Sequence, residues 1–433
     1  MRIAYVIPAY PPAPAQPFIV NEMIEVQEAG HEIVLLPLYA RRSWRVTHAT
    51  YARLRPVLVL PAALVDVTSL GLALWTLLRH PLRVFVTLFG LHRAAGLNPY
   101  AHVRLVAVTP KALAAAWRLR RAAVDRIHAH FANQTADCAA IAGSVSGIPF
   151  SFTAHAYDIY SRAPRHRNDT LGWKLAHAVQ VFTVNDYAGG LLRAALPAGA
   201  ADRVQTVYVG IPMHLFRSEP APPRAGTLRL LSVARFAETK GLETLIDAAA
   251  LLRDRGVAFD LRIYGDGPLR DALAGRIARL ALADRVHLED PIPQEAVAAE
   301  MRAAHVLVLP CRRDRFGDMD GIPTVFMEAM ATGRPVVSCP VSGIPELVRD
   351  GETGLLVPSD DPTALATALE RLARDSALTE ALGRQARALV ERQHDQRTNA
   401  RRLLALMTRS PGLESRNGRA VQETVIDGAR DGC

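Results

Sequence analysis

The chain has 433 residues, of which half are apolar and only 6% are aromatic, so its composition excludes a disordered or fibrous protein and favours an α/β protein of two or three domains. The four cysteines form no CxxC pair and no Cys/His cluster, which argues against a disulfide framework or a zinc site and favours a reducing compartment. The net charge of +9 arises in the first 220 residues, which hold 22 basic and 12 acidic residues against 29 and 30 in the remainder.

The N-terminal half opens with a strand-like run, RIAYVIP, and lacks the regions of a secretory signal peptide, so we expect a cytoplasmic protein. Apolar runs then alternate with helical segments, a pattern that predicts βαβ units and a parallel sheet covered on both faces. The predicted strands of this half cover residues 2–8, 32–38, 126–131, 149–155, 179–185 and 204–210.

A basic and apolar stretch at 41–124 interrupts this alternation after the second strand. It carries 13 Lys and Arg and one acid, Asp66, together with two long apolar runs. Basic and apolar character together favour peripheral contact with an anionic membrane surface, and a buried core segment remains the alternative. Nucleic acid is less favoured because aromatic stacking runs are absent from the sequence. Pro61 and Asp66 argue against a membrane-spanning helix.

The C-terminal half alternates more regularly. It contains predicted strands at 228–234, 259–265, 285–288, 305–310, 334–339 and 354–358, and predicted helices at 241–256, 269–282, 294–304, 324–333 and 344–351. The sequence therefore predicts two doubly wound, Rossmann-like domains that face a cleft. Ligands of such sheets bind at the carboxyl ends of the strands.

A proline-rich, aperiodic segment at 217–227 marks the predicted domain boundary. The expected organisation is an N-terminal domain at 1–216 with the insertion at about 41–124, a C-terminal domain at 228–393, a crossover helix at 394–409 that returns to the N-terminal domain, and a flexible tail at 410–433.

Two carboxylates, Asp320 and Glu328, flank the corner between the strand at 305–310 and the helix that begins near Thr324. Free N–H groups and the dipole at a helix start favour an anion, and Gly321 allows a close backbone approach. Because carboxylates accept hydrogen bonds from hydroxyls, the corner suits a sugar and a ribose on either side of a diphosphate. A capped helix with solvated acids is the alternative that spacing alone leaves open.

Two basic residues, Arg235 and Lys240, lie in the loop after the strand at 228–234. Guanidinium and ammonium groups at this edge suit a diphosphate that leaves with growing negative charge. A solvated loop is the alternative.

The segments SVARFAETKGLETLIDAAALL, YGDGPLRDAL and DMDGIPTVFMEAMATGRPVVSCPVSGIPELVRDGETGLLVP together resemble the family 4 retaining glycosyltransferases, which have the GT-B fold. The resemblance covers most of residues 228–375. In the N-terminal half, AQPFIVNEMIEVQEAGHEIVLLPL and RIHAHFANQTADCAAIAGSVSGIPFSFTAHAYDIY resemble the subgroup that builds bacterial exopolysaccharides, including the colanic acid glycosyltransferases.

The resemblance implies a role for each matching position. Arg235 and Lys240 bind the donor diphosphate, and Glu328 binds the ribose. Asp320 stands beside the transferred sugar where the family has a glutamate, so its side chain is one methylene shorter. The backbone N–H groups that would contact phosphate are those of Gly321, Ile322, Thr324 and Val325.

Three histidines of the N-terminal half follow or form strands. The resemblance implies that His155 contacts the donor sugar and that Asp158 contacts the sugar or the acceptor, with a structural histidine as the alternative. His128 and His130 share one face of a strand, but no third metal ligand is evident, so we expect a structural or acceptor-side role and no metal.

The expected function is transfer of a sugar, with retention, from a UDP- or GDP-linked donor to a lipid-linked saccharide acceptor. We expect an enzyme that uses no cofactor and no metal. The expected catalytic residues are His155, Asp320, Arg235 and Lys240. The expected location is the inner face of the bacterial cytoplasmic membrane. The N-terminal domain would bind the acceptor and the C-terminal domain the donor. The alternatives are a nucleotide-sugar 2-epimerase of the same fold and a non-catalytic nucleotide-sugar or polysaccharide-binding regulator.

Overall fold

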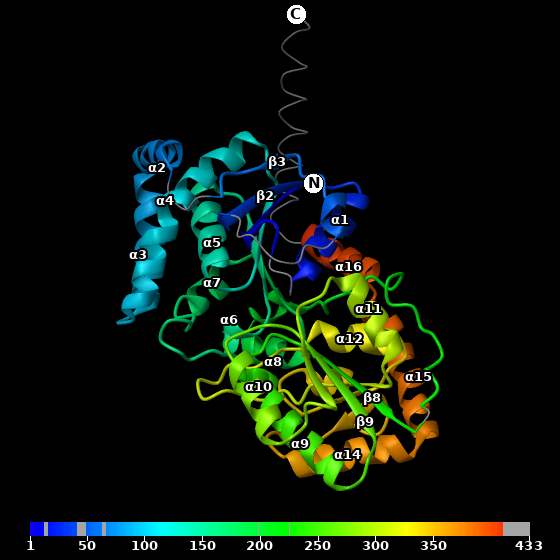
Figure 1. Ribbon diagram of the computed structural model, residues 1–433. Helices are drawn as coiled ribbons and strands as arrows, with labels where there is room; N and C mark the ends of the chain where they lie inside the picture. The colour runs from blue at the N-terminus through cyan, green and yellow to red at the C-terminus, as the bar shows by residue number, and fades with distance from the viewer. Residues whose placement is uncertain (13–15, 41–48, 63–65, 198, 225, 410–433) are drawn as a thin grey trace, which may run out of the picture.

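The computed structural model describes residues 1–12, 16–40, 49–62, 66–197, 199–224 and 226–409, which fold around two parallel sheets (Figure 1). The predicted tail at 410–433 lies outside the described residues, as does part of the 41–124 stretch. Both sheets carry helices on their two faces, so the predicted pair of doubly wound domains is confirmed.

The N-terminal sheet has seven parallel strands in the order β3-β2-β1-β4-β5-β6-β7. Alternate residues of β1 face opposite layers. Tyr5 packs with helices α1 (Pro17–Glu28) and α16 (Gln396–Thr408), whereas Val6 packs with α4 (Pro99–Arg121) and α5 (Gln134–Ser146). The strands are β1 Arg2–Ala9, β2 Glu32–Tyr39, β3 Leu58–Val59, β4 Arg126–His130, β5 Phe150–Ala154, β6 Gln180–Thr183 and β7 Val204–Thr206. The helices outside the insertion are α1 Pro17–Glu28, α5 Gln134–Ser146, α6 Tyr157–Tyr160, α7 Leu171–His177 and α8 Asp186–Ala194, with a 3-10 turn η2 at Ala201–Arg203.

The C-terminal sheet has six parallel strands in the order β10-β9-β8-β11-β12-β13. Each overlaps a predicted run, and only β10 extends beyond its run, by one residue. The strands are β8 Leu228–Val233, β9 Phe259–Tyr264, β10 Val286–Glu289, β11 Val306–Val308, β12 Val336–Ser338 and β13 Gly354–Leu356. The helices are α9 Leu242–Asp254, α10 Arg270–Arg279, α11 Gln294–Ala303, α12 Thr324–Ala331, α13 Ile344–Leu347, α14 Pro362–Arg374 and α15 Ser376–Gln393, with a 3-10 turn η3 at Glu238–Lys240.

The last described helix, α16 Gln396–Thr408, returns to the N-terminal domain and lies beside α1 (Figure 1). Leu403 and Met407 enter the same buried cluster as Met23 of α1. The Gln396 side chain donates to the carbonyl oxygen of Asn21 at 3.3 Å. The expected return of the C-terminal helix is therefore confirmed.

The stretch at 41–124 forms helices that the sequence did not resolve: η1 Ala49–Arg53, α2 Val67–Arg79, α3 Pro81–Ala95 and α4 Pro99–Arg121. Its inner side chains, such as Leu91 and Leu105, join the core beneath α5, so the buried-core alternative holds for one side of the stretch. Among the described residues, no single helix is both long and apolar enough to cross a membrane. The pair α2 and α3 meets that test only together and is bent by 104° between the two helices.

Candidate active site

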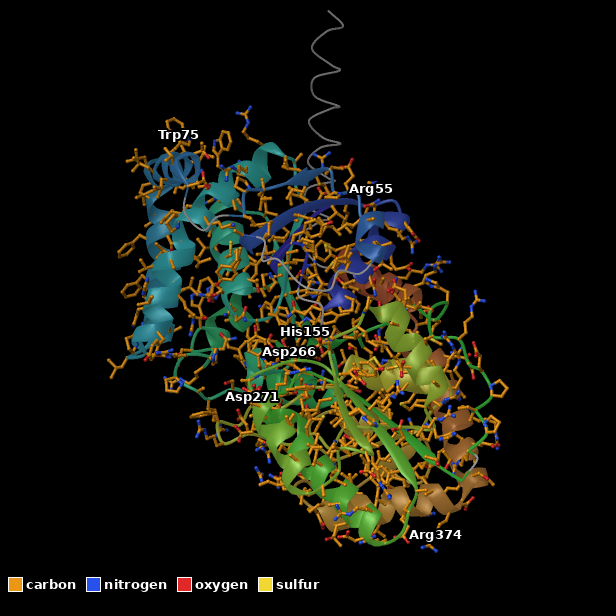
Figure 2. All side chains as sticks on the ribbon, in the orientation of Figure 1. Arg55, Trp75, His155, Asp266, Asp271 and Arg374 are labelled. Atoms are coloured by element: carbon orange, nitrogen blue, oxygen red, sulfur yellow. The ribbon has the colours of Figure 1, made fainter. Side chains whose placement is uncertain are left out.

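The candidate site lies where loops from the carboxyl ends of both sheets touch. The loops after β5 and β6 meet the loops after β11 and β12. A Cβ on Gly321 would lie 3.0 Å from the carbonyl oxygen of His155 and 2.8 Å from Nδ2 of Asn185, and one on Gly343 would lie 2.6 Å from Cβ of Asn185. Figure 2 shows His155 at this junction of the two domains. The structure thus brings together residues that the sequence placed in separate halves.

The space beside Gly321 is occupied by the N-terminal domain and not, as predicted, open to a phosphate. We expected its missing side chain to admit a phosphate, but the space is taken by the N-terminal domain, since His155 and Asn185 lie against it. A larger residue at 321 would push the two domains apart.

Lys240 and Asp320 form an ion pair, with 2.5 Å between Nζ and Oδ1. Both side chains are largely buried, with 15% and 22% exposed. Gly241 makes the pair possible: its φ of +60° suits glycine, and a Cβ there would overlap the carbonyl oxygen of Pro310. This close approach draws the loop after β8 against the loop after β11.

Burial alone would lower the pKa of Lys240, but the Asp320 carboxylate more than offsets this, and the pKa of Lys240 is raised. The ammonium group is therefore charged throughout the neutral range. Sequence reasoning had given Lys240 to a diphosphate and Asp320 to a sugar, whereas the structure joins them to each other.

The second carboxylate oxygen of Asp320, Oδ2, is buried and has no hydrogen-bond partner among the described residues. A buried carboxylate oxygen without a donor is costly, by about 1–3 kcal/mol or more. Such an oxygen is the expected acceptor for a hydroxyl group of a bound ligand.

Arg235 is exposed beside this pair. Within the described part of the chain its guanidinium group makes neither a hydrogen bond nor an ion pair. Its positive charge opposes the rise in the pKa values of Lys240 and Asp318, so the guanidinium group lies near both side chains. Arg235 is thus a free cation next to a paired one.

Helix α12 begins at Thr324 as predicted, but Pro323 is its N-cap residue and not part of its first turn. Proline offers no N–H and no side-chain cap. Among the described residues, the N–H groups of Gly321, Ile322, Thr324 and Val325 find no acceptor. Four unbonded donors of the kind that suit an anion therefore lie at the start of the helix and in the two residues before its N-cap.

Glu328 lies one turn further along α12 and is buried. Its Oε1 accepts a hydrogen bond of 2.8 Å from Nε2 of Gln294, the first residue of α11. Burial raises the pKa of Glu328 to about 7, and the hydrogen bond from Gln294 opposes the shift. A fixed carboxyl group that is half-ionised near neutral pH suits a ligand hydroxyl better than a phosphate.

His155 is buried between two rings, with its centroid 4.5 Å from that of Phe131 and 5.1 Å from that of Phe18. Its Nε2 lies 3.2 Å from Nδ1 of His130. Burial, followed by the charge of His130, lowers the pKa of His155 well below its ordinary value. His155 is a neutral group at this junction, able to donate or accept a hydrogen bond but not to carry charge.

Asp158 has a structural role, which corrects the predicted contact with sugar or acceptor. Its carboxylate is fully buried and accepts hydrogen bonds from the backbone N–H groups of Ala132, His155 and Ala156, at 2.6 to 3.1 Å. Burial raises its pKa, and these bonds oppose the shift. Asp158 therefore fixes the loop that carries His155.

His128 and His130 are also buried, and Glu22 from α1 supplies the third group that the sequence did not reveal. One ligand atom from each of the three lies within 4.8 Å of the others. Both ring nitrogens of His128, however, already bond to hydroxyls, Nδ1 to Ser151 at 3.0 Å and Nε2 to Thr153 at 3.1 Å. The arrangement fits a hydrogen-bonded cluster behind His155, which favours the structural alternative over the acceptor-side one.

Sequence reasoning missed two residues of the site. Burial and the nearby Asp314 and Asp320 raise the pKa of Asp318 to about 6. Asn185 is fully buried at the start of α8, and its Nδ2 has no hydrogen-bond partner among the described residues. The sequence signal for Asp318 is its position two residues before Asp320, and for Asn185 its place as the last residue of a predicted strand.

Comparison with known proteins identifies the family. Residues 227–375 match the sequence model described as glycosyl transferases group 1. WcaL of Escherichia coli K12, whose name assigns it to colanic acid biosynthesis as a glycosyltransferase, is 39% identical over 225 residues, which are 51% of this chain and 54% of WcaL. WcaL of Salmonella typhimurium, which carries the same name, is 30% identical over 425 residues, which are 94% of this chain and 99% of that protein.

Among solved structures, Anabaena HepE in complex with UDP and glucose matches with a TM-score of 0.66 at 18% identity, over 94% of this chain and 99% of HepE. At this identity the likeness supports the shared GT-B fold. The match to the Salmonella protein extends over nearly the whole of both chains, and this chain therefore belongs to the group 1 glycosyltransferases.

Proposed function

We propose that the protein transfers a sugar, with retention at the anomeric carbon, from a nucleotide-sugar to a lipid-linked saccharide in exopolysaccharide biosynthesis. The observation that carries the proposal is the Lys240–Asp320 pair, in which one buried carboxylate oxygen lacks a donor beside a free arginine. This site offers an acceptor for a sugar hydroxyl next to cations for a diphosphate.

The donor site has complementary parts on one side of the junction. Arg235, Lys240 and the free N–H groups at the start of α12 would hold the diphosphate, and the carboxyl group of Glu328 would accept a hydrogen bond from the ribose. HepE, which shares the fold, was crystallised with UDP and glucose. That likeness supports a nucleotide-sugar donor, UDP- or GDP-linked.

The chemistry follows from charge. Departure of the diphosphate leaves an oxocarbenium-like sugar, and fixed positive groups stabilise the negative charge that develops on the leaving group. Arg235, Lys240 and the N–H groups at the start of α12 would stabilise this negative charge without a metal ion. His155, neutral and rigidly packed, would hold the sugar by a hydrogen bond, and the departing phosphate would take the proton of the acceptor hydroxyl on the same face.

Two observations, the names of the relatives and the basic, apolar stretch at 41–124, support our proposal for the acceptor and its location. The WcaL proteins are named for biosynthesis of a bacterial exopolysaccharide, colanic acid. We therefore propose a lipid-linked saccharide as the acceptor and place the enzyme in the cytoplasm, at the inner face of the cytoplasmic membrane.

A panel of activated sugars tests this function. Purified protein is incubated in EDTA with UDP- and GDP-linked sugars, with and without a lipid-linked acceptor extract, and released nucleoside diphosphate is measured. Release from one donor, stimulated by the extract and giving a product with retained configuration, is expected. Conversion of the donor to its 2-epimer without transfer would indicate the epimerase instead, and binding without release in the presence of extract would indicate a regulator.

Two substitutions separate the roles of the ion pair. In Asp320→Asn, Lys240 loses its anionic partner and stays available to phosphate, so the affinity for nucleoside diphosphate should persist while turnover falls about 100-fold, as for other lost transition-state contacts. In Lys240→Ala, both affinity and turnover should fall. Calorimetry measures the affinity for nucleoside diphosphate and product release measures turnover, with exposed Arg279→Ala as control.

The diphosphate role of the two cations has its own test. Full turnover in both Arg235→Ala and Lys240→Ala would refute that role.

A further inference from the structure

Helix α2 turns its large apolar side chains away from the protein. The residues that it buries are small or polar, namely Ser69, Ala73 and Thr76, whereas its exposed residues include Leu74 and Leu78. A helix that faces water on its outer side has the opposite arrangement. The outer face of α2 is therefore built to contact an apolar medium or partner.

Helix α3 is apolar on both faces. Val84 and Leu91 are buried against the domain, while Leu82 and Phe85 point outward with 73% and 65% of their surface exposed. Phe85 also stacks on the exposed Phe89 at a centroid distance of 5.8 Å. Both helices form the outer flank of the N-terminal domain, opposite α1 and α16, and Trp75 of α2 lies on this flank (Figures 1 and 2).

A basic pocket of about 230 Å³ opens at the edge of this apolar surface. A cavity of about 10–15 Å³ is enough for one water, so this one has room for a hydrated phosphate group. Its walls come from the end of α2, the end of α4 and the end of α5, and its lining is rich in arginine and tryptophan with no acidic residue. Trp75, Arg79, His80, Trp117, Arg120 and Arg121 line it.

The arginines of the pocket are not neutralised. Within the described residues, Arg79, Arg120 and Arg121 form no ion pair with a carboxylate, and neither does Arg83 nearby. Burial, followed by the charges of Arg120, Arg79 and Arg83, lowers the pKa of His80, as expected where positive groups gather. The pocket is an electropositive site that lacks an anion of its own.

The surface around the pocket is also positively charged. Residues 66–124, which form α2, α3 and α4, carry Arg or Lys at eight positions and a single acid, Asp66. Asp66 caps α2 by accepting from the N–H of Ser69 at 2.8 Å, and Arg118 donates to the Ser69 hydroxyl at 3.0 Å. Lys111 is buried and donates to the carbonyl oxygen of Leu38 at 3.1 Å, so it belongs to the core and not to this surface.

We propose that the outer faces of α2 and α3 insert into the interfacial layer of an anionic phospholipid bilayer, and that the pocket formed by Arg79, Arg120 and Arg121 binds a lipid phosphate group. The proposal rests on the proposed function, in that a lipid-linked acceptor brings the enzyme to a bilayer. The exposed apolar side chains match the acyl chains of such a bilayer. The arginines, which form no ion pair with a carboxylate, match its anionic headgroups. A second copy of this chain would bring a like-charged pocket against the first, and repulsion disfavours it.

Flotation with lipid vesicles tests the charged part. The protein should float with phosphatidylcholine vesicles that contain phosphatidylglycerol, in a salt-sensitive manner, and not with pure phosphatidylcholine. The double variant Arg79→Gln/Arg120→Gln should lower the partition coefficient about 30-fold, at roughly one factor of five for each cation near the surface. The matched control is Arg279→Gln/Arg392→Gln, because these arginines also lie exposed in the last turns of their helices, α10 and α15. Equal loss in both double variants, or no flotation of the unaltered protein, would overturn the proposal.

A second pair of variants tests the apolar part. Leu74→Ser should weaken binding to the anionic vesicles about tenfold or more, since a leucine is lost from the buried face, whereas Leu191→Ser, another exposed helical leucine, should not. Both leucines are exposed, so neither change should alter the unfolding midpoint in urea. Brominated lipids should quench the fluorescence of Trp75, and the quenching should disappear in Trp75→Phe. Unquenched Trp75 or equal effects of the two serine variants would contradict insertion.

Three further readouts separate this surface from its rivals. Alkaline carbonate should release the bound protein; retention would show that α2 and α3 enter the bilayer as a bent spanning pair. Light scattering should give a monomer without lipid; a dimer that Leu74→Ser dissociates would assign the face to a second copy. Hydrolysis of the nucleotide-sugar without vesicles should be unchanged in Arg79→Gln/Arg120→Gln. If the unaltered protein does not hydrolyse any nucleotide-sugar, the proposed function is contradicted, whereas the membrane proposal is still tested by flotation alone.

Discussion

Burial sets the charge of individual residues at the candidate site. Glu328 and Asp318 sit where burial raises their pKa values to about 7 and about 6, while burial keeps His155 neutral. Lys240 stays charged because Asp320 pairs with it. Neutral pH therefore falls close to the titration of two carboxyl groups, so ligand binding at this site is linked to proton release.

The pH dependence of nucleotide binding should follow Glu328. A carboxylate that accepts a ribose hydroxyl binds in its ionised form, and with a pKa of about 7 in the free protein that form is about tenfold scarcer at pH 6 than at pH 8. The affinity for nucleoside diphosphate should thus be about tenfold weaker at pH 6, as measured by calorimetry. Glu328→Gln should bind more weakly at pH 8 and lose most of this dependence. The exposed Glu352→Gln serves as control, and an unchanged pH profile in Glu328→Gln would contradict the assignment.

The same group affects folding with a defined sign. An acid whose pKa is raised by folding holds more protons in the folded state, so stability falls as pH rises from the ordinary value of 4.5 towards 7 and is constant above it. Glu328→Gln should remove this part of the slope in urea unfolding.

At the scale of elements, one buried ion pair connects helices behind the site. Nζ of Lys174 in α7 lies 2.7 Å from Oδ1 of Asp137 in α5, and Thr170 donates to the same carboxylate oxygen at 2.7 Å. Lys174 also donates to Asn168, whose amide in turn bonds to the carbonyl oxygens of Ala132 and Asp158. The network therefore supports the loop that Asp158 fixes and that carries His155.

Breaking this pair should be costly. Asp137→Ala leaves the Lys174 ammonium buried without its carboxylate, and loss of one partner of a buried pair costs about 3–5 kcal/mol of unfolding free energy. Urea denaturation measures it. The control is Glu380→Ala, because Glu380 pairs with Arg384 at the surface, where such a pair contributes at most about 1 kcal/mol. Similar midpoints for the two variants would show that the Asp137 network adds little.

At the scale of the molecule, hydrogen bonds between the loops after β6 and β12 and between the two chain crossings join the two domains. The Glu346 carboxylate in α13 accepts from the N–H groups of Asp186 and Tyr187 at 2.9 and 2.8 Å, at the start of α8 in the other domain. The chain passes between the domains twice, near Ile211 and again near His394. These two crossings lie side by side, and the N–H of Ile211 donates to the carbonyl oxygen of His394 at 2.9 Å. A movement between the domains must pivot at these crossings and release Glu346.

Glu346→Ala should loosen the closed arrangement. The amides of Asp186 and Tyr187 lose their acceptor, so their hydrogen exchange should accelerate at least tenfold, and donor turnover should fall because His155 and α12 no longer meet as readily. Exchange mass spectrometry and product release measure these effects, with Glu352→Ala as control. Faster exchange throughout the C-terminal domain would indicate unfolding in place of opening.

The alternation of apolar runs was enough to predict both sheets, because each buried parallel strand shows as a short apolar segment between helices. It missed β3, because its two exposed residues lie inside the long apolar run at 56–78 and nothing in that run marks where a short strand begins or ends. It also left 41–124 unassigned, since α3 is apolar on both faces and its periodicity is masked. The candidate site was predicted in part: strand ends and the start of α12 locate Arg235, Lys240, Asp320 and Glu328.

The sequence by itself therefore determined the two-domain α/β architecture and the family, because strand periodicity and local motifs are written along the chain. Only the tertiary structure decided which residues act together. It paired Lys240 with Asp320, 80 residues away, enclosed Asp158 in backbone N–H groups, and placed Gly321 against the other domain. These outcomes depend on how loops from separate strands approach one another, which is set by packing between distant segments and has no signature in any local pattern of residues.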